Sequence, residues 1–252
     1  MKVSIITVCY NSENTIRNTI ESVLAQNFSD VEYIIVDGAS KDGTMAIIND
    51  FRNQIAMVIS ESDKGIYDAM NKGIMAATGD IVGILNSDDF YENNHVISSV
   101  VEVFSKQPAI DMVFGDVVFV QPENLTVICR HYYAGHFKAW KLRFGWMPPH
   151  PATFVKRKLY LENGLYKTNF KIAADYEMFV RWLLVHKSSY QWIDQVLVRM
   201  RMGGASTGGI KSSILLNREI VMACKINNIK TNLLFVLSKI PFKMLELFRR
   251  PS

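Results

Sequence analysis

The first half of the chain alternates nearly continuous apolar runs with amphipathic segments. Runs such as "VSIITVCY" at 3–10 lack the alternation of a strand with one wet face and are typical of strands buried on both faces. In the segments between them, apolar residues recur at helical spacing, and the first such helix, at 11–28, has Asn11 or Ser12 as its expected cap. The predicted strands are 3–10, 32–40, 55–62, 80–89 and 111–120, and the predicted helices are 11–28, 42–53, 66–78 and 96–108.

This order of elements predicts an α/β, Rossmann-like fold, in which a mainly parallel sheet is flanked by helices on both faces. In such sheets, ligands bind beyond the carboxyl ends of the strands. The segments "CYN", "DGAS" and "NSDD" all lie at predicted strand ends. We therefore expect a binding site where these three segments meet.

The alternation ends near residue 120. The segment 131–154 is rich in aromatic residues, histidine and proline, which predicts irregular structure with a short strand at 152–157. Residues 174–186 predict a helix. The glycine- and serine-rich segment 203–209 predicts a mobile loop.

Composition places the chain among ordinary globular proteins. It has 252 residues, of which 49% are hydrophobic and 21% charged, and its formal net charge of +4 gives no indication of a nucleic-acid partner. Three well-separated cysteines support neither a disulfide framework nor a cysteine-based zinc site, which favours a reducing compartment. No run reaches the roughly 18 apolar residues of a membrane-spanning helix, and the N-terminus lacks the cleavage site of a signal sequence. We therefore expect a cytoplasmic location.

Two adjacent carboxylates, Asp88 and Asp89, follow the apolar run of the predicted strand 80–89. Like charges at a strand end are unfavourable unless solvent or a cation compensates them. Mg²⁺ is commonly held by one or two carboxylates together with substrate phosphates. On these residues alone, the pair predicts either a metal site that bridges a diphosphate or a solvated turn in which one acid caps the next helix.

Other candidate ligands lie at the neighbouring strand ends and at the start of the helix 66–78. The ring of Tyr10 could pack on a nucleobase or in the core. Asp37 could accept hydrogen bonds from a base or ribose, or form an Asx-turn. Asp63, Asp68 and Asn71 could bind a ligand or cap and solvate the helix.

Taken together, the motifs "VSIITVCYN", "VDGASKDGT", "GIYDAMNKGI", "LNSDD", "PPHPATFVKR", "ADYEMFVRW" and "MGGAST" resemble family 2 glycosyltransferases, which have the GT-A fold. The likeness covers about residues 1 to 210 and is greatest to bacterial enzymes that build capsule, O-antigen or colanic-acid-type polysaccharides. It implies a nucleotide-diphospho-sugar donor, a divalent metal (Mn or Mg) and inverting transfer to a glycan or polyprenyl-diphosphate-linked acceptor.

The resemblance also assigns residues. Gly38 follows Asp37 where many members have a second acid, and Asn86 stands at the first position of the family's Asp-x-Asp motif, which leaves Asp88 and Asp89 to hold the metal. The implied donor-binding residues are Val8, Tyr10, Asn11, Asp37, Asp63, Asp68, Asn71, Asp88 and His150.

The late acidic motif assigns the general base to Asp175, preceded by Ala174 where many members have Glu. Inverting transfer needs a carboxylate that takes the proton of the acceptor hydroxyl. An acid early in a helix also suits the helix dipole, and on that ground Asp175 and Glu177 fit equally well. His150, which stands between prolines, could donate to the diphosphate, bind the metal or be structural.

The predicted organisation is a nucleotide-sugar-binding half (1–120), an acceptor and catalytic half of the same domain (121–209) and a basic, amphipathic, helical tail (210–252). Pro241 divides the tail into two short pieces, which we expect to lie on the inner face of the membrane, attracted to anionic lipid. The alternatives are a helix docked on the domain and a homodimer contact.

Two other functions are considered beside this enzyme. A nucleotide-sugar-binding protein without activity would not need Asp175 as well as the acidic pair. Transfer of a sugar directly to polyprenyl phosphate is the alternative reaction. A Rossmann dehydrogenase is disfavoured, because no G-x-G-x-x-G motif follows the first strand.

Overall fold

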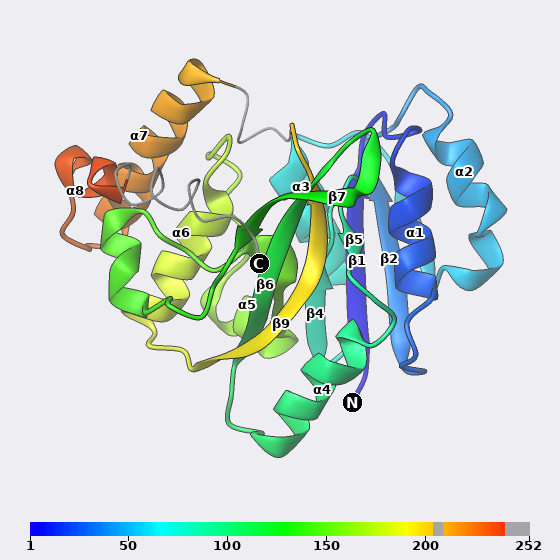
Figure 1. Cartoon of the computed structure of the whole chain (residues 1–252), viewed down its shortest axis with the longest axis horizontal. Coiled ribbons are helices and arrows are strands. Elements are labelled where there is room, and N and C mark those ends of the chain that lie inside the picture. Colours follow the sequence, from blue (N-terminus) through cyan, green and yellow to red (C-terminus); the bar gives the residue numbers. More distant parts are fainter. Residues whose placement is uncertain (204–208, 240–252) are drawn as a thin grey trace.

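The computed structural model describes residues 1–203 and 209–239 (Figure 1). In these two ranges, nine strands form one sheet in the order β3-β2-β1-β4-β8-β6-β9-β5, and β7 pairs with β6. The strands are β1 Val3–Cys9, β2 Val31–Asp37, β3 Met57–Ser60, β4 Ile81–Ile84, β5 Phe90–Tyr91, β6 Met112–Gln121, β7 Asn124–Tyr132, β8 Thr153–Lys156 and β9 Tyr190–Arg201.

The four strands β3-β2-β1-β4 are parallel, and they confirm the predicted α/β sheet. Every residue of β1 and β4 is buried, in agreement with their nearly continuous apolar sequences. β8 runs antiparallel between β4 and β6. The halves 1–120 and 121–209 therefore contribute strands to the same sheet.

Helices cover both faces of the sheet. α1, α2 and α4 share one apolar core, which includes Ile20, Ile48 and Val100, and α3, α5, α6 and α7 share the other, with Met70 and Phe179. Figure 1 shows α1 and α2 on the right of the sheet and α6, α7 and α8 on the left. The helices are α1 Ile16–Leu24, α2 Thr44–Asp50, α3 Ile66–Ala76, α4 Val96–Lys106, α5 Arg157–Asn163, α6 Ala174–Val180, α7 Ile210–Ile226 and α8 Leu233–Leu237, with a π-helical turn at Arg181–Val185 and the short 3₁₀ helices η1 Arg52–Gln54, η2 Ala139–Phe144 and η3 His150–Ala152.

The first helix is shorter than predicted. α1 begins at Ile16, and neither Asn11 nor Ser12 caps it. Asn11 has a positive φ of 49° and its N–H donates to Ser40 Oγ, while the Ser12 N–H donates to Thr44 Oγ1. Because these side chains after β2 bind the N–H groups, the polypeptide after β1 forms a loop instead of a first helical turn.

β9 is a long strand that the sequence pattern does not predict. Between the pairs Phe114–Trp192 and Asp116–Val196, three residues of β9 lie opposite one residue of β6. This bulge interrupts the alternation of apolar and polar residues by which a strand is recognised in a sequence. β5 and β7, also unpredicted, are a two-residue strand and a largely exposed hairpin strand.

The predicted tail is partly a docked helix. In α7, Ile220, Ala223 and Cys224 are at most 2% exposed and belong to the core shared with α6, so the docked-helix alternative holds for this segment. Residues 240–252 of the tail and 204–208 of the predicted mobile loop lie outside the described residues. Among the helices described, none combines the length and apolarity that a membrane crossing requires.

Candidate active site

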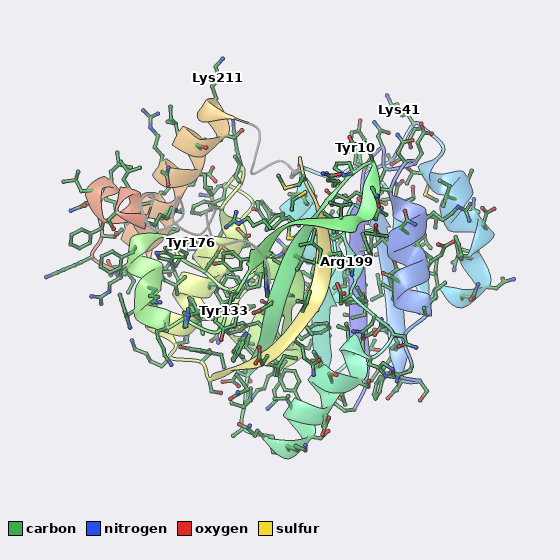
Figure 2. All side chains as sticks on the ribbon, viewed as in Figure 1. Tyr10, Lys41, Tyr133, Tyr176, Arg199 and Lys211 are labelled. Atoms are coloured by element: carbon green, nitrogen blue, oxygen red, sulfur yellow. The ribbon has the colours of Figure 1, made fainter. Side chains whose placement is uncertain are left out.

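A cavity of about 730 Å³ lies at the carboxyl ends of β1 and β4, where the sequence predicts a binding site. Its wall includes the end of β1, the start of α3, the turn after β4, the start of α6 and the end of β9. In Figure 2, Tyr10 lies at the upper end of the sheet, just beyond β1. The predicted site residues that line the cavity are Val8, Tyr10, Asn11, Asp63, Asp88, Asp89, His150 and Asp175.

Asp37, a predicted donor-binding residue, lies outside the cavity wall. Its side chain is fully buried, and its carboxylate accepts hydrogen bonds from the Ser40 N–H at 3.1 Å, the Ser60 hydroxyl at 2.7 Å and the Ser40 hydroxyl. Ser40 Oγ in turn accepts the Asn11 N–H at 2.8 Å. In this position Asp37 supports Asn11 from behind and has no open face toward a ligand.

Asp68 and Asn71, also predicted to bind the donor, lie outside the cavity as well. Asp68 accepts the Lys64 N–H at 3.0 Å, as a residue at the start of a helix commonly does. The Asn71 amide forms two hydrogen bonds with the backbone of Tyr166, each 2.9 Å long. Asp68 thus binds the backbone just before α3, whereas Asn71 connects α3 to the segment at Tyr166.

Tyr10 and Asp63 both contact Gly38. Tyr10 is 60% exposed. A Cβ atom on Gly38 would lie 2.5 Å from Asp63 Oδ2 and 3.4 Å from Tyr10 Cδ2, so the Asp63 carboxylate fills the space of a side chain at this position. Asp63 thus supplies, from after β3, an acid beside the place where the resembling family has its second one. At such a place the ring can stack on a nucleobase, and the neighbouring carboxylate can accept hydrogen bonds from the N–H groups of the base.

The turn after β4 brings the amide of Asn86 and the carboxylates of Asp88 and Asp89 to the cavity wall. Asp89 is 1% exposed and accepts a hydrogen bond from Asn86 Nδ2 at 3.0 Å. Burial, together with the negative charge of Asp88, raises the pKa of Asp89 well above its usual range. A proton or a bound cation would offset the repulsion between these two carboxyl groups.

These three side chains fit a hard divalent cation. The buried Asn86 Oδ1 has no hydrogen-bond partner, and carboxylate and carbonyl oxygens are the ligands that Mg²⁺ and Mn²⁺ prefer. No cluster of three or more His, Cys, Asp or Glu side chains that could enclose a metal occurs in the described part of the chain. Such a cation would therefore take further ligands from substrate phosphates or water.

Two cations at the cavity wall, Arg201 and Lys171, are not marked by any predicted motif. The Arg201 guanidinium donates to the Asp88 carbonyl and to Asn18 Oδ1, the latter at 2.9 Å, and it lies 5.2 Å from the ring centroid of Phe90. Burial lowers the pKa of Arg201, and the nearby acids oppose this shift. A guanidinium and an ammonium at this wall can bind phosphate oxygens.

Asp175 lies in the first turn of α6 and lines the same cavity. Its Oδ1 accepts the Tyr176 N–H at 2.7 Å. Burial raises the pKa of Asp175 to about 6, against the effect of backbone hydrogen bonds, and the negative charge of Glu219 adds to the rise. A carboxyl that ionises near the working pH is suited to general-base catalysis.

The structure also distinguishes Asp175, which the resemblance assigns as the base, from Glu177, which suits the helix dipole equally well. Glu177 is fully buried and lies outside the cavity wall. Its carboxylate pairs with Arg181 and Lys167, each at 3.0 Å, and accepts a hydrogen bond from the side chain of Asn227. Glu177 is thus a structural acid, and Asp175 faces the cavity.

His150 lines the cavity and is partly buried. Its Nε2 lies 2.5 Å from the Tyr166 hydroxyl. Burial lowers the pKa of His150 to about 4, so the imidazole is neutral at physiological pH. It can offer a hydrogen bond to a ligand but not a positive charge.

Comparisons with known proteins identify glycosyltransferases as relatives of this chain. The family described as "Glycosyl transferase family 2" matches residues 4–160. An uncharacterized glycosyltransferase of Mycobacterium tuberculosis is 33% identical over 185 residues, which cover 73% of this chain and 69% of the relative. A PGL/p-HBAD biosynthesis glycosyltransferase of Mycobacterium bovis is 29% identical over 181 residues, covering 71% and 68%. The hyaluronan synthase of Pasteurella multocida is 28% identical over 222 residues, which are 87% of this chain and 22% of the synthase.

Two solved structures confirm the predicted fold. S. aureus TarS 1-349 in complex with UDP-GlcNAc superimposes with a TM-score of 0.70 at 18% identity, over 95% of this chain and 72% of that one. The mannosyltransferase PcManGT from Pyrobaculum calidifontis in complex with GDP-Man and Mn²⁺ has a TM-score of 0.68 at 18% identity, over 98% and 73%.

Proposed function

The chain belongs to glycosyltransferase family 2, and from this premise we propose that it transfers a sugar, with inversion and with a divalent metal, from a nucleotide-diphospho-sugar to a glycan or polyprenyl-diphosphate-linked acceptor in cell-surface polysaccharide synthesis. The observation that carries the proposal is that one cavity contains both the oxygen-rich turn at Asp88 and Asp89 and the carboxyl of Asp175. A protein that only binds the donor has no need of an acid with a raised pKa in that cavity. This argues against the binding-protein alternative.

At the nucleoside end of the donor, Tyr10 stacks on the base and the Asp63 carboxylate accepts its N–H groups. The exposed ring of Tyr10 and its position beside Asp63 support this placement. Val8 and Asn11 complete the wall at the end of β1. Asp37 contributes through the loop that it holds and not through a direct contact.

At the diphosphate end, Asp88 and Asp89 would hold the metal, and Asn86 Oδ1 would be a further oxygen ligand. A bound Mn²⁺ or Mg²⁺ would neutralise charge that develops on the leaving diphosphate. Arg201 and Lys171 add positive charge at the same wall. His150, which is neutral, donates a hydrogen bond from its ring.

In the transfer step, Asp175 takes the proton of an acceptor hydroxyl while that oxygen attacks the anomeric carbon. The bond between the acceptor oxygen and the anomeric carbon forms as the bond from that carbon to the diphosphate oxygen breaks. The nucleoside diphosphate leaves with the bonding electron pair. A single displacement of this kind inverts the configuration of the sugar.

The named relatives support the choice of substrates. TarS and PcManGT were solved with UDP-GlcNAc and with GDP-Man and Mn²⁺, which makes these two donors and this metal the first to test here. Two relatives are named as a hyaluronan synthase and as a PGL/p-HBAD biosynthesis glycosyltransferase. The first of these names supports a glycan acceptor for this chain.

The test uses the purified full-length chain with UDP-GlcNAc or GDP-mannose, with and without Mn²⁺. Metal-dependent release of nucleoside diphosphate that is lost in Asp175→Asn supports a transferase. Donor binding without turnover, in the presence of lipid-linked glycan acceptors, would support the binding-protein alternative. Product formed only on polyprenyl phosphate would support the alternative reaction.

We also propose that the enzyme lies peripherally on the inner face of the membrane. Trp140, Leu233, Leu234 and Phe235 are 46% to 77% exposed, and the Phe144 ring stacks on Phe235 at 5.3 Å. We call these five residues, from η2 and α8, the apolar surface.

Basic residues accompany the apolar surface. No acid occurs in the sequence from 124 to 161 or from 220 to 239, whereas Lys138, Lys141, Arg143 and Lys230 lie beside or near its members in the chain. Thr231 donates to the Arg143 carbonyl, which joins the two segments. Aromatic and aliphatic side chains with surrounding cations are typical of proteins that bind anionic bilayers.

Flotation with phosphatidylglycerol vesicles tests this location. The full-length chain should float at low salt, and Trp140→Glu with Leu234→Glu should abolish flotation. Leu161→Glu, at a leucine that is 51% exposed on α5, is the matched control and should float normally. If the double variant changes the oligomeric state and not flotation, the apolar surface is a homodimer contact.

A further inference from the structure

Glu219 is a buried carboxylate that belongs to none of the recognised motifs. It stands in the middle of α7, outside the residues 4–160 that match the family, and is 7% exposed. Its Oε1 accepts the Lys171 N–H at 2.8 Å, and its Oε2 accepts the N–H groups of Ile172 and Ala173, both at 2.9 Å. A single carboxylate thus binds three consecutive backbone donors.

These donors belong to the segment that leads into α6. Ala173 is the N-cap of this helix, and no side chain caps it. In a capping box, an acid in the third helical position binds the N-cap N–H, but here that position holds Tyr176. Glu219 makes the equivalent bond from another helix, and the same bonds satisfy its own buried charge.

The segment is also held from its other side, because the Tyr67 hydroxyl donates to the Ile172 carbonyl. Lys171 and Ile172 line the cavity, and Asp175 follows in the first turn of α6. α3 and α7 together therefore determine where this short segment lies. A displacement of the segment would displace Asp175 with it.

We propose that Glu219 is a positioning residue for sugar transfer: by binding the N–H groups of residues 171–173, it fixes how Asp175 is presented to the cavity. The inference rests on the proposed function of Asp175 as the general base. It gives α7 a part in catalysis beyond covering the core. A group displaced by about 1 Å can cost a reaction on the order of a hundredfold in rate.

The charge of Glu219 acts on the same carboxyl. The titratable side chains that interact with Asp175 are Tyr67 from α3, Tyr166 from the loop after α5 and Glu219 from α7. Burial raises the pKa of Asp175 to about 6, the negative charge of Glu219 raises it and the Tyr67 hydroxyl lowers it. Loss of the Glu219 charge should therefore lower the pKa of Asp175, which loss of packing alone would not do.

The experiment compares Glu219→Gln with Glu177→Gln in the full-length chain. Both remove one buried negative charge, but the Glu177 carboxylate pairs with Arg181 and Lys167 and does not accept the N–H groups of residues 171–173, which Glu219 binds. Two measurements need no substrate: the pKa of Asp175 from NMR titration of its ¹³C-labelled carboxyl, assigned with Asp175→Asn, and hydrogen exchange of the amides of Lys171, Ile172 and Ala173. The third measurement is kcat with Mn²⁺ and whichever donor, UDP-GlcNAc or GDP-mannose, supports turnover.

For Glu219→Gln we expect a lower pKa of Asp175, faster exchange of the three amides and a kcat about tenfold to a hundredfold lower, with a nearly unchanged KM for the donor. Glu177→Gln should lower the melting temperature and leave the Asp175 pKa and the amide exchange unchanged. Should Glu219→Gln fail to fold, Glu219→Asp keeps the charge on a shorter side chain and should lower kcat while the Asp175 pKa stays near that of the wild type.

Two results would overturn the proposal. One is a Glu219→Gln protein in which the Asp175 pKa and the amide exchange equal those of the wild type. The other is a Glu219→Gln protein in which the Asp175 pKa and the amide exchange both change but kcat equals that of the wild type. Normal turnover in Asp175→Asn is a different failure, since it would refute the proposed function of Asp175 and with it the premise.

Discussion

The proposed donor side of the cavity and its proposed catalytic side are built in different ways. Tyr10, Asp63 and Asp88 lie on short loops directly after β1, β3 and β4, and each lines the cavity from the loop where its motif occurs. Asp175 instead depends on a segment that Tyr67 and Glu219 hold from two distant helices. The donor side is thus determined locally, and the catalytic side by long-range contacts.

This difference predicts two kinds of mutant. Donor-side substitutions at the cavity wall should weaken ligand binding and leave the fold nearly intact, because these side chains are few and face the cavity. Substitutions on the catalytic side should change turnover and stability together, because the groups there are buried and bonded to one another. The experiments below test this contrast.

The largest effect is expected for Asp175→Asn. Loss of a general base typically lowers the rate by about 10²- to 10⁴-fold, so kcat should fall by that factor while donor affinity stays unchanged. The folded-state pKa of about 6 lies above the ordinary value of 3.8, which means that ionised Asp175 destabilises the fold above pH 6. Calorimetry at pH 7.5 should therefore show a higher melting temperature for the variant. An unchanged kcat would contradict the assignment of the base.

Asp88→Asn should have the next largest effect. The charge pair that this variant breaks is the proposed one between Asp88 and the metal. Loss of one member of such a pair costs about 2 to 5 kcal/mol, so donor affinity measured calorimetrically with Mn²⁺ should fall at least about thirtyfold. Asp68→Asn is the matched control, because Asp68 stands between the lining residues Tyr67 and Ala69 in sequence but is not itself part of the cavity wall. Equal losses in both variants, or full activity of the wild type in a chelator, would contradict the metal assignment.

Tyr10→Ala should have a smaller effect on the donor side. Stacking of a base on an aromatic ring contributes about 1 to 3 kcal/mol, and the affinity for free UDP or GDP should decrease accordingly. Tyr133→Ala is the control, since Tyr133 is also exposed, at 45%, and lies far from Tyr10 in Figure 2. A thermal shift with nucleotide distinguishes the two, and equal shifts would place the base elsewhere.

The pH dependence of turnover should show the smallest change. Transfer needs ionised Asp175, whose pKa is about 6. Below that pH, kcat/KM, which reports the ionisation of the free enzyme, should fall about tenfold per pH unit, and at pH 6 it should be about half of its plateau value. Glu219→Gln should shift this acidic limb of the pH–rate profile to lower pH, because it lowers the pKa of Asp175. A limb near pH 4 in the wild type would indicate that the base is not buried during turnover.

The sequence predicted most of the donor half, because nearly continuous apolar runs and the polar residues after them are local features. It could not distinguish a wall residue from one behind the wall: Asp37 and Asp88 both follow apolar strands, yet Asp37 is closed off by Ser40 and Ser60. Ser40, three residues away, fits the Asx-turn alternative, but Ser60 lies 23 residues away on β3, and no local pattern records its contact.

The second half was predicted less well for a physical reason. The bulge near Asp116 removes the alternation of β9, and Arg201 reaches the cavity only because β9 pairs with β6. Glu219 has no motif at all, and its role follows from three backbone N–H groups about 46 residues earlier. The resemblance to a known family identified Asp175, but only tertiary contacts separate it from Glu177.

The place of β8 in the sheet has a consequence during synthesis on the ribosome. β1 to β4 emerge first and can pair as parallel strands, but β4 lacks its other neighbour until residues 153–156 have been made. Until then its free edge exposes unpaired N–H and C=O groups between apolar side chains, which is a template for pairing with another nascent chain. A translational pause before residue 153 should thus favour aggregation, whereas a pause after β8 should be harmless to this edge.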